Sequence, residues 1–217
     1  EELWCRSNFP ENLDIVSAIR ETGNFFNISR RHFDCTLVAA ICFKDIVKIS
    51  MVGDGGFFVR RKGSNIVKFV TVEYESGAPF YFSYIINGSK ELDSYIEEFG
   101  DKRITVRYRW VDINKRAIVS ESSYSDLAKN INIEEVRCWR YNSLGIECGG
   151  GFSDGFLSFM KEGSTVPFAE IASEFVSFKN YNGKFVDRRL ANGLGRKCKN
   201  ENIVHYDDIS CAAIYFE

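Results

Sequence analysis

Three acidic sites at the edges of apolar strands contain the residues of this sequence best suited to chemistry. They are Gly53-Asp54-Gly55, Ser153-Asp154-Gly155 and His205-Tyr206-Asp207-Asp208. The short Asp side chain holds its carboxylate close to the backbone, and in the first two sites a neighbouring Gly permits a tight turn with room for an ion and its waters. Hard divalent cations prefer oxygen ligands, so carboxylates without a Cys or His ligand set favour Mg2+ or Mn2+.

A structural role is the alternative at each of these positions. Asp-Gly is a common turn dipeptide, and a single such site is more often a hairpin turn or a helix cap than a ligand. Asp154 in particular would cap a helix over residues 156–160, FLSFM. Taken singly, each site favours the structural interpretation, and only the surrounding sequence changes that judgement.

The composition excludes several classes of partner. The chain has 217 residues, 45% of them apolar, and a formal net charge of -2. That charge argues against nucleic acid, because affinity for a polyanion comes largely from clustered Lys and Arg. The short basic runs 60–62 and 188–189 fit solvated faces better than a binding stripe. Since no apolar run is long enough to cross a bilayer, we expect no membrane partner.

The cysteines favour free thiols over disulfides or zinc. There are seven, an odd number, and Cys35, Cys42 and Cys211 lie in apolar, strand-like runs that predict buried thiols. The sequence has no CxxC pair and only two His residues, so a zinc site would lack the usual ligand spacing. With no basic, apolar leader at residue 1, we expect a cytoplasmic protein.

Helical spacing and strand alternation predict the elements that must position these aspartates. Caps and apolar residues at i, i+3, i+4 and i+7 predict helices over 10–23, 89–100, 164–178 and 184–195. Apolar runs and alternation predict strands over 35–43, 46–56, 57–61, 66–74, 103–113 and 207–216. The polar region 120–140 fits a loop or a short helix. Because strands and helices do not alternate regularly, we expect an α+β fold of two antiparallel sheets with helices outside.

Three sequence motifs resemble, in their order along the chain, those of the metal-dependent protein phosphatases, the PPM or type 2C Ser/Thr phosphatases. TLVAAICFKDIVKISMVGDGGFFVRRKG resembles a central hairpin leading into a Gly-Asp motif, and GGGFSDGFLSF resembles the Ser-Asp-Gly motif. VHYDDISCAAIYF resembles the closing Asp-Asn or Asp-Asp motif, and FVDRRLANGLG resembles the helix before it in bacterial members. Each motif is weak alone, but their order and separation strengthen the match, which spans residues 33–216.

The resemblance implies one α-β-β-α sandwich domain over residues 1–217, with two Mn2+ or Mg2+ ions at one end of the two antiparallel sheets. A water made acidic by the metals would attack phosphoserine or phosphothreonine, so the implied partner is a phosphoprotein substrate or a regulatory protein. Asp154, followed by Gly155, resembles the ligand of the Ser-Asp-Gly motif, and Asp207 resembles the ligand of the closing motif. Asp208 occupies the usual Asn position, and Asp54 resembles the ligand of a weaker third metal.

The family's bridging ligand, an Asp in an N-terminal Asp-Gly motif, has no counterpart in residues 1–50. Their aspartates, Asp14, Asp34 and Asp45, are not followed by Gly, so we expect the domain to be incomplete at its N-terminus. Three interpretations follow, ranked in this order. The chain is part of a phosphatase whose N-terminal strands lie elsewhere, or a pseudophosphatase that binds a partner or phosphopeptide, or a binding module with accidental Asp-Gly turns.

His205 lies two residues before Asp207 and has two possible roles. As a general acid it would protonate the leaving alkoxide. As a surface residue it would merely mark the beginning of the last strand region, and this is the interpretation that we prefer.

Overall fold

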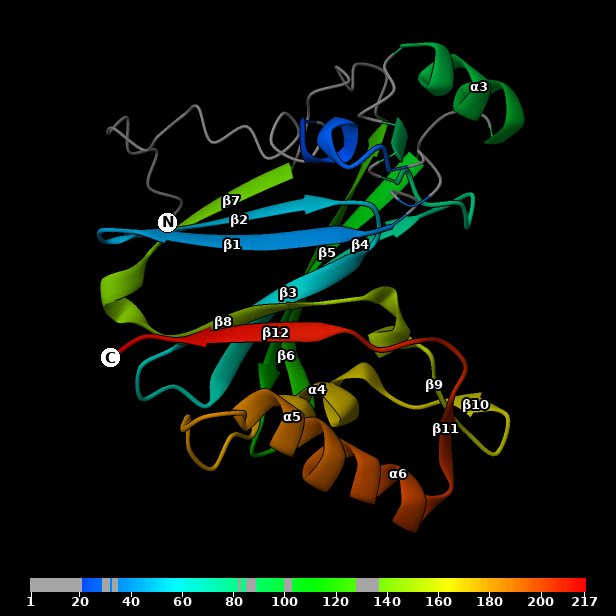
Figure 1. Cartoon of the computed structure of the whole chain (residues 1–217). Helices are drawn as coiled ribbons and strands as arrows, with labels where there is room; N and C mark the ends of the chain where they lie inside the picture. Colours follow the sequence, from blue (N-terminus) through cyan, green and yellow to red (C-terminus); the bar gives the residue numbers. More distant parts are fainter. Residues whose placement is uncertain are drawn as a thin grey trace. The chain divides into compact units, whose positions relative to one another are not determined.

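Within the residues that the structure describes, the strands form three sheets (Figure 1). The structure, a computed structural model, describes residues 21–28, 32, 35–81, 83–84, 89–99, 103–127 and 137–217. Every strand pair whose register is defined within these residues is antiparallel. The predicted α+β class with antiparallel sheets is therefore confirmed.

The first sheet contains the hairpin predicted from two apolar runs. Its order is β1-β2-β7, where the strands are β1 (Leu37–Phe43), β2 (Ile46–Val52) and β7 (Arg137–Asn142). The hairpin register pairs Leu37 with Val52 and Phe43 with Ile46, leaving a turn at Lys44-Asp45. On β2 Val47, Ile49 and Met51 are buried as the sequence alternation predicts, but Ser50, expected on the exposed face, is also buried.

The second sheet has six strands in the order β12-β8-β3-β4-β5-β6 within the described residues. The strands are β3 (Gly55–Arg61), β4 (Ile66–Tyr74), β5 (Arg103–Asp112), β6 (Ala117–Leu127), β8 (Ile146–Phe152) and β12 (Cys211–Tyr215). Strands β3 and β4 are the second predicted hairpin, and β8 pairs with both β3 and β12. The last strand of the chain is thus joined to the strand that precedes Asp154.

Two helical segments cover one face of this sheet (Figure 1). Helix α4 (Phe168–Val176) follows Pro167, and α5 (Phe185–Arg189), the π-helical turn η4 (Leu190–Leu194) and α6 (Gly195–Glu201) form one continuous helix. The ring of Phe175 meets Phe58 of β3 edge-to-face at 5.6 Å, and Phe168 meets Phe69 of β4 at 5.3 Å. Aromatic edge-to-face packing therefore fixes α4 on the sheet.

A small third sheet was not expected from the sequence. It has the order β10-β9-β11, with β9 (Phe159–Lys161), β10 (Ser164–Thr165) and β11 (Ile203–His205). The shorter elements are η2 (Ser143–Gly145) and η3 (Asp154–Leu157), both 3-10 turns, and the amphipathic helix α3 (Ser89–Phe99), which confirms the helix predicted over 89–100. Strands of two or three residues are too short to carry a detectable periodicity.

Three local predictions are wrong. The region 120–140 is not a loop or helix where it is described, because β6 runs to Leu127 and β7 begins at Arg137. Strand β6 is the last strand in the sheet order, and its residues 118–125 are exposed. This exposure explains why the segment is polar and why apolar and polar residues do not alternate along it. The last helix does not end at Gly195 but continues to Glu201 and ends at Asn202, whose φ is +53°. Residues 156–160 form a 3-10 turn and a strand rather than a helix.

Other predictions fall partly outside the described residues. Of the helix predicted over 10–23, only residues 21–23 are described, and they are helical. Cysteines 35, 42, 148, 198 and 211 are free. The predicted burial is wrong for Cys35 and Cys42, which are exposed, because Cys35 precedes β1 and Cys42 lies beside the hairpin turn at Lys44-Asp45.

The chain divides into two compact units. One contains residues up to 54, 72–105 and 125–143, and the other contains 55–71, 106–124 and 144–217. The expectation of a single domain over 1–217 stays a prediction. Among the described residues, no helix combines the length and the apolar character that a membrane crossing requires.

Replacement of Phe175 by Ala tests the packing of α4 on the sheet. Phe175 is 0% exposed and contacts Phe58, Phe156 and Phe178, so we expect the free energy of unfolding to fall by about 3–5 kcal/mol. Urea denaturation measures the change, with Ile118→Ala on the exposed part of β6 as the control, expected to cost less than about 0.5 kcal/mol. Equal losses in the two variants would contradict this packing.

Candidate functional site

Two strand ladders bring the first acidic segment (153–155) and the second acidic segment (207–210) together. Strand β8, which precedes the first segment, pairs with β12, which follows the second, so that Phe152 lies opposite Cys211. Strand β9, which follows the first segment, pairs with β11, which precedes the second, so that Phe159 lies opposite His205. Each acidic segment is thus tied at both ends to the strands that flank the other, although more than fifty residues separate them in sequence.

Hydrogen bonds from Ser153 join the two acidic segments directly. The Ser153 N–H donates to the Ser210 carbonyl at 2.9 Å. The Ser153 hydroxyl donates to the Asp208 carbonyl at 3.0 Å and accepts a hydrogen bond from the Ser210 N–H, also at 3.0 Å. These bonds satisfy backbone groups that the break between the two ladders would otherwise leave unpaired. Ser153 therefore fixes the second segment beside Asp154.

Gly155 makes the closest approach between the segments. A Cβ atom built on Gly155 would lie 2.2 Å from the Asp208 carbonyl oxygen and 3.2 Å from that of Asp207. A side chain at position 155 would therefore push the two backbones apart. Gly55 of β3 also lies close to the first segment. A Cβ atom built on Gly55 would lie 2.7 Å from the Phe152 carbonyl oxygen and 3.4 Å from the Asp154 nitrogen.

The carboxylates of both segments accept hydrogen bonds from neighbouring backbone amides. Asp154 is half-buried, and its Oδ1 accepts from the Gly155 N–H at 3.0 Å. Asp207 is exposed, and its Oδ1 accepts from the Asp208 N–H at 2.8 Å. These contacts hold each carboxylate close to its own backbone, as short Asp side chains commonly do. Asp154 also lies at the start of a turn whose Phe156 is 1% exposed, which anchors that segment in the core.

Asp54, the third predicted ligand, lies in the other unit, between β2 and β3. It is half-buried, and its Oδ1 accepts a hydrogen bond from the Thr36 hydroxyl at 2.8 Å. Gly53 is packed against the same Thr36, with φ of +85°. Its assignment as the ligand of a weaker metal stays a prediction.

His205 is exposed beside the second acidic segment. Its Nδ1 lies 3.0 Å from the Asp207 carbonyl oxygen, and its ring centroid lies 5.7 Å from that of Phe159. With the proton on Nδ1, the imidazole donates to that carbonyl and restrains the turn before Asp208. Whether His205 also acts as a general acid stays a prediction.

The donor set of the two acidic segments is the kind that hard cations prefer. It consists of carboxylate and backbone carbonyl oxygens, as expected for Mg2+ or Mn2+. In the described part of the chain, no group of three or more His, Cys, Asp or Glu side chains could together hold a metal ion. Asp154 and Asp207 each accept the N–H of the following residue, and their assignment as metal ligands stays a prediction.

Comparisons with family models, with curated proteins and with solved structures found no match for this chain.

The sequence motifs do not identify the residues that hold the acidic sites in place. Ser153 and Ser210 join the two acidic segments, and Thr36 bonds to Asp54 in the other unit. A Ser or Thr directly before Asp-Gly at the end of a buried strand can indicate a contact between segments, because its hydroxyl can bond to the backbone of a neighbouring segment. No sequence signal identifies Ser210 or Thr36, because their partners are set by the tertiary fold.

Gly155→Ala tests whether the two segments are in backbone contact. The new methyl group would overlap the Asp208 carbonyl, so we expect the free energy of unfolding to fall by about 1–3 kcal/mol. We also expect faster hydrogen exchange at the Ser210 amide, measured by NMR. Gly145→Ala is the matched control, because nothing lies within 4 Å of the added atom. If both variants leave the Ser210 amide unchanged, the described contact is wrong.

Proposed function

We propose that this chain contributes two ligand-bearing segments to the active site of a metal-dependent Ser/Thr protein phosphatase. One observation carries the proposal. The two motifs that resemble the family's metal-binding motifs are distant in sequence, yet their backbones are joined through Ser153 and Gly155. The proposed substrate is a phosphoserine or phosphothreonine protein in the cytoplasm.

In the proposed site, Asp154 and Asp207 hold the metal. A divalent cation bound there supplies charge neutralisation for phosphate and lowers the pKa of a coordinated water. Ser153 and Gly155 keep the two carboxylates on adjacent backbones, and His205 restrains the Asp207 carbonyl. The family resemblance assigns a bridging carboxylate to an N-terminal Asp-Gly motif, which the intact protein must supply from outside residues 1–50.

The proposal includes the α-β-β-α sandwich implied by the same resemblance. Such a fold needs helices on the outer face of each sheet. The packing of Phe168 and Phe175 of α4 on β3 and β4 supports this arrangement for the six-stranded sheet.

A pseudophosphatase that binds a regulatory protein or phosphopeptide is the second candidate. The observation that favours it is the local pairing of both carboxylates, because Asp154 and Asp207 each accept the N–H of the next residue. Such turns are stable without a cation. The two candidates differ in whether phosphate is released.

Phosphate release from a phosphothreonine peptide by the intact protein tests the proposal. We expect release in Mn2+ and none in EDTA. Because a catalytic metal contributes several kcal/mol of charge stabilisation, Asp154→Ala and Asp207→Ala should each lower kcat/KM on the order of a hundredfold.

The control for these variants is Asp187→Ala, an exposed carboxylate on α5 that is expected to leave kcat/KM unchanged. Hydrolysis that persists in EDTA would reject the metal mechanism. Peptide binding without release would favour the pseudophosphatase instead.

A further inference from the structure

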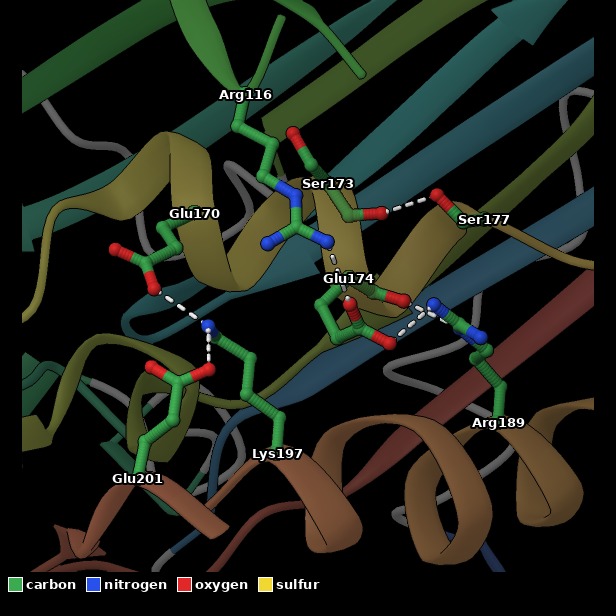
Figure 2. Close-up of polar contacts among 8 residues, drawn as sticks. All are labelled: Arg116, Glu170, Ser173, Glu174, Ser177, Arg189, Lys197 and Glu201. Carbon is green, nitrogen blue, oxygen red and sulfur yellow. Dashed lines mark hydrogen bonds and ion pairs between the residues drawn. The ribbon is translucent and has the colours of Figure 1, made fainter. Parts of the chain in front are cut away.

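A row of ion pairs lies between α4 and the continuous helix α5–η4–α6 (Figure 2). We call it the helix seam, and its pairs join Glu170 to Lys197 and Glu174 to Arg189. The Lys197 Nζ lies 2.5 Å from Glu170 Oε1 and 2.7 Å from Glu201 Oε1, and its side chain is 6% exposed. The Arg189 Nη2 lies 2.5 Å from Glu174 Oε1, and both side chains are about 15% exposed. Charges this deeply buried require their partners.

The π-helical turn explains how two basic residues reach the same seam. Arg189 and Lys197 are eight residues apart, which in a regular α-helix would offset them by about 80° around the helix axis. In η4 the Gly195 N–H donates to the Leu190 carbonyl, an i→i+5 bond that inserts one extra residue. The two side chains therefore lie as i and i+7 do in an α-helix, on one face. They meet Glu174 and Glu170, which are i and i+4 on α4.

The Lys197 end of the helix seam is connected to both acidic segments. Helix α6 ends at Glu201, and β11 follows at once and leads to Asp207. Glu201 also pairs with Lys161 of β9 at 3.7 Å, and Lys161 lies opposite Ile203 of β11. Strand β9 in turn follows the turn that begins at Asp154. The Arg189 end lies a further two helical turns before Asp207, and its helix α5 contacts β12, the strand after the second acidic segment.

We propose that Lys197, with Glu170 and Glu201, is a positioning residue that sets the second acidic segment against the first. Strand β11 has only three residues, too few to hold a defined position alone. Its position depends on its pairing with β9 and on α6, and Lys197 joins α6 to α4. Burial alone would lower the pKa of Lys197, but the hydrogen bonds and charges of the two glutamates raise it, so the ammonium stays charged. The inference rests on the proposed function for its metal-binding readout only.

A pair of matched variants, Lys197→Met and Arg189→Met, tests this inference in the intact protein. Both remove a buried cation from the helix seam, so both should lower the melting temperature. Only Lys197→Met should speed hydrogen exchange at amides 203–210 in the metal-free protein. Only Lys197→Met should weaken Mn2+ binding in calorimetry, by on the order of tenfold, as loss of an outer-shell support commonly does.

Similar exchange at amides 203–210 in the wild type and in Lys197→Met would overturn the inference, and so would equal acceleration in both variants. If Lys197→Met does not fold, the triple variant Glu170→Gln, Lys197→Met, Glu201→Gln removes the charges together and carries the same expectation. If wild-type protein takes up no Mn2+, the metal site of the proposed function fails, while the exchange result still decides the positioning role.

Discussion

The pairing of β8 with β12 and of β9 with β11 is the constraint on which the candidate site depends. Antiparallel registers fix Phe152 opposite Cys211 and Phe159 opposite His205. Each acidic segment connects a strand of one pair to a strand of the other. The two segments therefore lie side by side, because paired strands hold both of their ends. Ser153 then fills the interval between the ladders with three hydrogen bonds. Proximity of the two acidic segments is therefore a consequence of strand register rather than of the carboxylates themselves.

The two halves of the candidate site are stabilised by different means. The first acidic segment is anchored by Phe152, Phe156 and Phe159, each at most 2% exposed, which pack with one another beneath α4. The second acidic segment is exposed and has Ile203 as its nearest fully buried neighbour on the N-terminal side. Its position depends on Ser153, on β9 and on the charged contacts of α6. An apolar core thus supports one carboxylate, and a polar network supports the other.

The sequence predicted the long elements well, since β2, β5, α3 and α4 each show an uninterrupted period of two or 3.6 residues. It could not predict β6, whose exposed position removes the alternation, or the strands β9 and β11, which are too short to show one. It also could not predict the π-helical turn or the helix end at Asn202, because Gly195 lies inside the helix at the position where the sequence pattern predicts its end. Motif resemblance found Asp154 and Asp207, but Ser153 and Lys197 act through partners distant in sequence and leave no periodic signal.

In the proposed site, Asp154 and Asp207 face one cation. Paramagnetic broadening of amide NMR signals by substoichiometric Mn2+ tests this arrangement, because the effect falls steeply with distance from the ion. If both carboxylates bind the same ion, the amides of 153–156 and 206–209 lose intensity together and first. Broadening at only one of these segments, or first at other acidic surfaces such as Glu97-Glu98, would contradict it.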